Sequence, residues 1–101
     1  MPEVITQTQK GNTVITWFYT YDEDENLSDL DALPTIEVWK ENLRVIDPAP
    51  MSHYGIGVYR YELHTEAMSP GKYRIVCRGR LQGLQVVQDV PLEVTRPWLA
   101  V

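Results

Sequence analysis

The sequence predicts an all-β protein, an antiparallel β-sandwich of about seven strands. Hydrophobic and polar residues alternate with a period of two through most of the chain, and no segment carries a sustained helical stripe. Six Tyr, three Trp and one Phe, together with many Val, Ile and Thr residues, favour strands over helices. Gly and Pro residues divide the chain into short segments, as the turns of a sandwich require.

The expected strands follow from this alternation. They are 3–9, 13–21, 35–41, 43–47, 57–64, 72–80 and 84–95. We expect the first to lie at a sheet edge, and the fourth to end at Pro48 and Pro50, because proline has no N–H to donate to a ladder.

The last expected strand contains two residues that break its pattern. Pro91 occupies one of the alternate positions that face outward (the outward parity), which predicts an edge position or a bulge. Gln88 has the inward parity, which is otherwise apolar and formed by Leu84, Val86, Val90, Leu92 and Val94.

The chain of 101 residues predicts one domain over 1–101, with a core of about 11–95 and a tail at 96–101. A net charge of −5 argues against binding to nucleic acid or to an anionic membrane. The amino end lacks the pattern of a secretory signal. Cys77, the single cysteine, excludes an internal disulfide, so we expect folding in a reducing cytoplasm.

The register of 13–21 stays open from the sequence. Bulky residues occupy the odd positions, and smaller ones the even positions. If the even positions face the core, Trp17, Tyr19 and Tyr21 form an exposed aromatic strip. Trp39 follows the same logic, because inward Ile36 and Val38 would leave it on the outer face with Glu37. We predict that these aromatic residues contact a partner.

The run from Asp22 to Asp31 is strongly acidic. Its spacing does not complete an EF-hand, since Leu27 and Leu33 occupy the positions of the glycine and the bidentate glutamate. We expect no metal or other cofactor and an ordinary solvated connection, in which Leu27, Leu30 and Leu33 could form one helical turn. A looser calcium site is the alternative, with the ligands Asp22, Asp24, Asp29 and Asp31.

The sequence offers no catalytic constellation. His53 and His64 are isolated, and neither is accompanied by a nucleophile elbow or by metal-ligand spacing. Cys77 has the inward parity of its strand, which predicts a packed and unreactive thiol. We therefore expect a protein that is not an enzyme.

A positive stripe lies on the outward parity of 72–80, formed by Lys72, Arg74, Arg78 and Arg80. One interpretation is a solvated face whose charges pair with Glu62 across a neighbouring strand. The other is a contact surface in which Arg74, Arg78 and Arg80 meet the acidic run of another copy or another protein. The tail adds a further candidate anchor, Trp98, which either folds back on its own domain or reaches into a neighbour.

Three stretches, GNTVITWFYTYDEDEN, GVYRYELHTEAMSPGKYRIVCRG and VPLEV, resemble the immunoglobulin-like domains of bacterial surface proteins and phage structural proteins. The resemblance covers 11–95. It rests on an Asp-rich turn after a strand, a Gly-x-Tyr opening a later strand, and a Pro-Gly-x-Tyr opening the next. The chain departs from this pattern at Glu25, where the turn usually has Gly, and it lacks the cysteine pair of antibody domains. The resemblance implies a module that builds or binds.

From these observations we expect a non-enzymatic structural or interaction module. The setting that we favour is a phage virion, assembled in the host cytoplasm, where it would serve as a decoration, head-completion or tail accessory protein. Its partners would be other subunits, including copies of itself. The alternative is a carbohydrate-binding or adhesin-type module, in which aromatic rings stack on a glycan.

Overall fold

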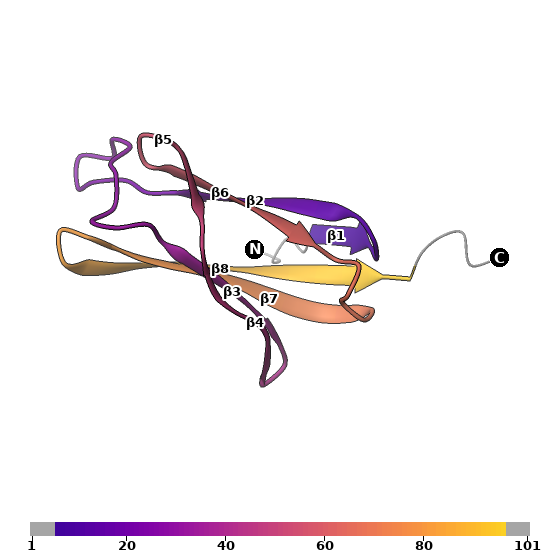
Figure 1. The fold of residues 1–101 in the computed structure, drawn as a ribbon. Coiled ribbons are helices and arrows are strands. Elements are labelled where there is room, and N and C mark those ends of the chain that lie inside the picture. Colours follow the sequence, from indigo (N-terminus) through magenta and orange to yellow (C-terminus); the bar gives the residue numbers. More distant parts are fainter. Residues whose placement is uncertain (1–5, 97–101) are drawn as a thin grey trace.

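The computed structural model describes residues 6–96, which form eight strands in two sheets packed face to face (Figure 1). The larger sheet has the order β1-β8-β7-β3-β4, and the smaller sheet has the order β2-β6-β5. The strands are β1 (Thr6–Gln9), β2 (Thr13–Tyr19), β3 (Thr35–Lys40), β4 (Leu43–Pro50), β5 (Ser52–Gly55), β6 (Val58–His64), β7 (Gly71–Leu81) and β8 (Leu84–Thr95). The predicted all-β sandwich is confirmed. None of the described residues belongs to a helix that could span a membrane.

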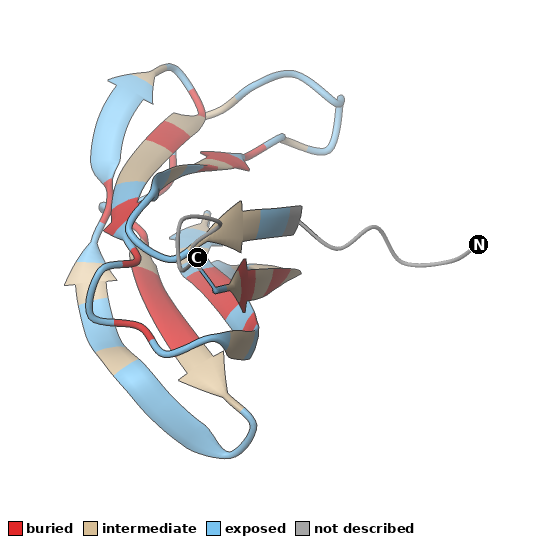
Figure 2. Cartoon of the chain, turned by 90° about the vertical axis from the view of Figure 1, so that its right-hand side faces the viewer, coloured by how far each residue is buried: buried red, intermediate tan, exposed pale blue. Residues whose placement is uncertain are grey.

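The core lies between the two sheets, and Figure 2 shows bands of buried residues on strands of both sheets. Strands β2, β3, β6, β7 and β8 contribute alternate residues to this layer, because successive side chains of a strand point to opposite faces. Burial of apolar surface stabilises the fold by roughly 25 cal/mol for each Å² removed from water. The most deeply buried side chains include Phe18, Ile36, Val38, Met51, Leu63, Cys77, Leu92 and Val94.

The strand order is that of an immunoglobulin-like sandwich. In the standard lettering, β2, β6 and β5 take the places of strands B, E and D, while β3, β7 and β8 take those of C, F and G. The hydroxyl of Tyr73, near the start of β7, donates to the carbonyl of Ser69 four residues upstream, at 2.5 Å. This is the tyrosine corner of such domains. It explains why a tyrosine, Tyr73, stands two residues after Gly71.

Three strand predictions were wrong in detail. The sheet is not wholly antiparallel, because β1 pairs with β8 in parallel. The short strand β5 was missed. The strand β4 continues through Pro48 and Pro50 rather than stopping there. Because β4 is the edge strand of its sheet, its prolines need no hydrogen bond on the outer side. Pro91 lies opposite Arg74 of β7, one residue before the described part of β8 that pairs with β1.

The predicted helical turn around Leu30 does not form. Leu30 is 8% exposed, whereas Leu27 and Leu33 are 41% and 55% exposed. The amide of Leu30 donates to the buried hydroxyl of Tyr59 at 2.9 Å. Its side chain packs so closely over Gly79 that a Cβ there would lie 2.5 Å from Leu30 Cδ1. One leucine of the three therefore closes this end of the sandwich.

Candidate functional site

The register of β2 is settled by burial. Thr16, Phe18 and Thr20 face the core, so Trp17 and Tyr19 lie on the outer face of the three-stranded sheet. Phe18 is 2% exposed, whereas Tyr19 is 47% exposed. Of the two registers left open by the sequence, the one with an outward aromatic strip is the one observed.

Trp17 and Tyr19 are part of a larger cluster that we call the aromatic face, formed by Trp17, Tyr19, Tyr54, Ile56 and Arg60. Tyr21, the third residue of the predicted strip, instead lines a depression beside the β7–β8 hairpin. Tyr54 lies on β5, and Ile56 lies in the turn between β5 and β6. Tyr21, Tyr54 and Ile56 are 54%, 65% and 69% exposed. The hydrogen bond from Thr20 N to Gly57 O, at 2.8 Å, brings that turn beside the end of β2. Tyr54 and Ile56 were missed because the strand that carries Tyr54 was not expected.

Trp17 is the centre of the aromatic face. Its ring lies 6.3 Å from that of Tyr19, with 22° between the planes, and meets the ring of Tyr54 edge-on at 5.0 Å. The guanidinium carbon of Arg60 lies 5.8 Å from the Trp17 ring centroid. Arg60 Nη2 also donates to Glu62 Oε1 at 2.8 Å. Three neighbours therefore hold Trp17, leaving it half-buried, while the two tyrosine rings stay open to solvent.

A shallow depression of about 550 Å³ adjoins the aromatic face. Its lining joins one exposed ring to several polar groups: Pro50, Ser52, Tyr54, Arg60, Tyr61, Glu62 and His64. Such a combination of ring and polar groups can bind a polar ligand that has apolar patches.

Trp39 lies on the opposite outer surface of the sandwich. It belongs to β3 in the five-stranded sheet, on the face with Glu37, as the alternation predicted. Its ring is half-buried, and the guanidinium carbon of Arg44 lies 5.8 Å from the ring centroid. The predicted partner-binding aromatics are therefore divided between two faces that cannot touch the same small ligand.

The arginines of β7 pair mainly within their own sheet. Arg74 Nε contacts Asp89 Oδ1 on β8 at 2.8 Å, and Arg78 Nε contacts Glu37 Oε1 on β3 at 3.1 Å. The suggested partner Glu62 was wrong, because it lies in the other sheet, where it pairs with Arg60. Arg80 is exposed near the end of β7.

Glu37 is a buried carboxylate at the centre of this outer face, 6% exposed. Burial by itself would raise its pKa. Hydrogen bonds from Trp39 and Arg78, with the charges of Arg78 and Arg44, outweigh that effect and leave the pKa lowered. Glu37 therefore stays ionised and fixes the guanidinium of Arg78.

The acidic run organises its own turn. Asp22 Oδ1 accepts hydrogen bonds from the amides of Asp24 and Asn26, at 2.9 and 3.0 Å. Glu25 has a φ of +64°, in the left-handed region. This is the position at which the resemblance expects glycine.

Asp29 and Asp31 each bind a different hairpin. Asp29 Oδ1 accepts from Gly57 N at 2.7 Å and contacts His53 Nε2 at 3.0 Å, so the pKa of Asp29 is lowered, chiefly by the Gly57 bond. The oxygens of Asp31 accept from Gln82 N and Gly83 N, and the bond from Gly83 is the main cause of its lowered pKa.

Three of the four carboxylates proposed for calcium, those of Asp22, Asp29 and Asp31, thus bind separate stretches of backbone rather than a common centre. Among residues 6–96, no group of three or more His, Cys, Asp or Glu side chains is placed to hold a metal ion.

The residues considered for catalysis have structural contacts. His64 Nδ1 lies 3.1 Å from Thr13 Oγ1, and His53 contacts Asp29. Cys77 is fully buried, which raises the pKa of its thiol to about 12. Such a thiol is not a nucleophile near neutral pH. Trp98, the predicted anchor of the tail, lies outside the described residues.

Comparison with known proteins gives a match in structure. No family model matches the chain, and the search of curated proteins found no match. Among solved structures, the endo-β-1,4-mannanase from Thermotoga petrophila is similar, with a TM-score of 0.65 and 19% sequence identity. The similarity covers 95% of this chain and 18% of the mannanase chain. At this identity the likeness shows the fold alone.

Proposed function

We propose that this protein is a non-enzymatic interaction module that binds a neighbouring protein subunit through its aromatic face. One observation carries the proposal: exposed Tyr19, Tyr54 and Ile56 surround the half-buried Trp17 and Arg60 on a single sheet face. Tyr, Trp and Arg are the residue types enriched at the energetic centres of protein interfaces. A continuous apolar patch rimmed by polar groups is typical of such a surface.

The packing within the aromatic face supports binding in a second way. Trp17 is held by Tyr19, Tyr54 and Arg60 before any partner arrives. Side chains that are already ordered lose little conformational entropy on association, so more of the contact energy appears as affinity. Tyr19 and Tyr54 add rigid rings, each with a hydroxyl that can bond to a partner.

A phage virion remains the setting that we propose for this module. The expectation rests on the resemblance of 11–95 to phage structural domains and on the single cysteine, Cys77. It predicts that the protein copurifies with a larger shell or tail particle, assembled in the host cytoplasm.

The test compares two double variants in capture from the native source. Tyr19→Ser with Tyr54→Ser removes the exposed rings of the aromatic face. Leu43→Ser with Leu84→Ser is the matched control, because Leu43 and Leu84 are 67% and 74% exposed elsewhere. We expect the tyrosine variant to lose the partner at unchanged melting temperature, and the leucine variant to retain it. Retention by both variants would contradict the proposed face.

Glycan binding is a second candidate, favoured by the depression beside Tyr54. Its polar lining suits sugar hydroxyls, and the Tyr54 ring is open. A glycan array that includes β-1,4-mannan oligosaccharides, chosen because of the structurally similar mannanase, tests it. Binding lost in Tyr54→Ala and kept in Trp39→Ala would establish this function. Absence of glycan binding would leave the protein partner as the proposal.

A further inference from the structure

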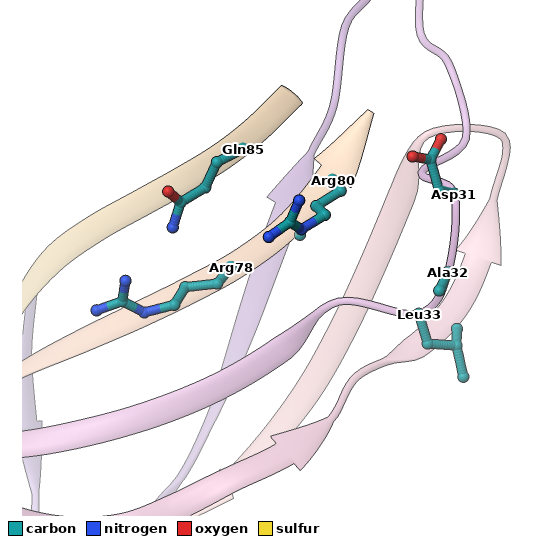
Figure 3. Close-up of a pocket in the computed structure, with 7 residues that line it drawn as sticks. Asp31, Ala32, Leu33, Arg78, Arg80 and Gln85 are labelled. Carbon is teal, nitrogen blue, oxygen red and sulfur yellow. The ribbon is translucent and has the colours of Figure 1, made fainter. Parts of the chain in front are cut away.

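A second pocket lies at the β7–β8 end of the five-stranded sheet, with a volume of about 330 Å³. Figure 3 shows Arg78, Arg80 and Gln85 side by side on the β7–β8 ladder, with Asp31, the last residue of the acidic run, on a separate segment. The lining residues are Asp31, Ala32, Leu33, Arg78, Gly79, Arg80 and Gln85.

The sheet geometry brings the three polar side chains together. Arg78 and Arg80 are two residues apart on β7, so they share the outward face. Gln85 on β8 is the direct cross-strand partner of Arg80. Gly79, between the arginines, faces Leu30, whose contact leaves no room for a Cβ. The backbone that carries the two guanidinium groups is therefore fixed from the core side.

The charges in the pocket are not balanced. Glu37 engages Arg78 through Nε, at 3.1 Å, which leaves the terminal amino groups of Arg78 with donors to spare. The guanidinium of Arg80 has no hydrogen bond or ion pair with the described residues, although its charge contributes to the lowered pKa of Asp31. The oxygens of Asp31 already accept the amides of Gln82 and Gly83.

We propose that this pocket binds the carboxylate side chains of an acidic segment of a protein partner. The planar fork of a guanidinium matches a carboxylate in two parallel hydrogen bonds, and Gln85 offers a further amide donor. Ala32 and Leu33 form an apolar wall for the methylene groups of a glutamate.

The protein as a whole has a net charge of −5, whereas this pocket is positive. The pocket therefore favours a partner whose negative charges are concentrated in one short segment. The assignment of the anion to a protein partner rests on the proposed function. The existence of the anion-binding site does not depend on that function. The pocket and the aromatic face lie on opposite outer surfaces, so the module can hold two neighbours.

The experiment titrates the purified full chain with a hexaglutamate peptide at low ionic strength, and follows the Nε–Hε signals of the arginines by NMR. We expect saturable shifts of Arg78 and Arg80. Arg80→Gln should weaken binding about tenfold, as the loss of one charge-assisted hydrogen-bonding group predicts. Lys72→Gln, the same charge change on the same face of β7, should change it less than about twofold. Arg78 is left intact because its removal would leave Glu37 buried without this partner.

Three results would overturn the proposal. The first is an absence of shifts at millimolar peptide. The second is an equal loss of affinity in Lys72→Gln and Arg80→Gln, which would indicate unspecific attraction. The third is tighter binding of inorganic phosphate than of the peptide, which would assign the pocket to phosphate. The aromatic-face double variant, Tyr19→Ser with Tyr54→Ser, should bind the peptide normally, so failure here is distinguishable from failure of the proposed function.

Discussion

The side-chain amide of Gln88 on β8 donates to the main-chain carbonyl of Trp17 on β2, at 2.9 Å. The two strands belong to different sheets, and β2 is an edge strand, so this carbonyl has no ladder partner on its outer side. The bond joins the sheets directly behind the aromatic face. It also explains why a polar residue interrupts the otherwise apolar inward parity of β8.

Gln88→Glu should destabilise the fold at neutral pH. The substitution keeps the size of the side chain but replaces the amide donor by a carboxylate, which meets the Trp17 carbonyl as a second acceptor. We expect a loss of about 1 to 2 kcal/mol in the free energy of unfolding, measured by urea denaturation at pH 7. Asn42→Asp, the same chemical change at an exposed turn residue, should have little effect. Equal losses in both variants would show that Gln88 makes no special contact.

Glu25→Gly should stabilise the protein. Glu25 adopts a φ of +64°, which costs a residue with a Cβ about 1 kcal/mol more than glycine. Thermal unfolding should therefore show a higher melting temperature for this variant. Glu23→Gly removes the same charge two residues earlier, where φ is not positive, and should not raise it. A lower melting temperature for Glu25→Gly would mean that the turn does not hold this conformation.

Gly57→Ala should be among the most damaging substitutions of a glycine. A Cβ at this position would lie 2.7 Å from both Ser28 N and Thr20 O, and the φ is +66°. Gly83→Ala is the control, because Gly83 has a φ of +80° but open space around its Cβ position. Denaturant unfolding should give a loss for Gly57→Ala that exceeds the control by about 2 kcal/mol or more. Similar losses in the two variants would contradict the close approach of the backbones.

Asp31→Ala should reveal a pH-dependent contribution to stability. The pKa of Asp31 is lowered from 3.8 in the folded state, so its ionised form stabilises the fold above that pH. The contribution is lost as the pH falls through the folded pKa. We therefore expect the difference in melting temperature between wild type and Asp31→Ala to be largest near pH 7 and to close below pH 3.8.

Asp24→Ala is the control for that measurement, since the Asp24 carboxylate accepts no hydrogen bond within 6–96. It should change the melting temperature at pH 7 less than Asp31→Ala does. A gap for Asp31→Ala that stays constant with pH would mean that the carboxylate does not hold the β7–β8 turn.

The sequence predicted the elements whose patterns are local. Alternation located β2, β6, β7 and β8, and it placed Trp39 and Glu37 together on an outer face. Alternation within one strand reports which residues share a face, but it does not report which face is buried. The buried face of β2 could therefore be assigned only from its tertiary contacts, because Phe18 is buried by contacts from the opposite sheet.

What the sequence did not predict depends on contacts between distant residues. Asp29 and Asp31 were grouped as candidate ligands by their spacing, yet their carboxylates bind amides 28 and 51 or more residues away. Tyr54 was missed because β5 has four residues, too few for a periodic signal. Gln88 could have been found, since a polar residue on an inward parity must have a partner.

The central claim is that the aromatic face contacts the partner, and residue-resolved hydroxyl-radical footprinting of the free protein and of its native assembly tests it most directly. We predict that Tyr19 and Tyr54 are oxidised in the free protein and protected in the assembly, while Leu43 stays reactive in both. Unchanged oxidation of Tyr19 and Tyr54 in the assembly, with protection at Leu43 instead, would contradict the account.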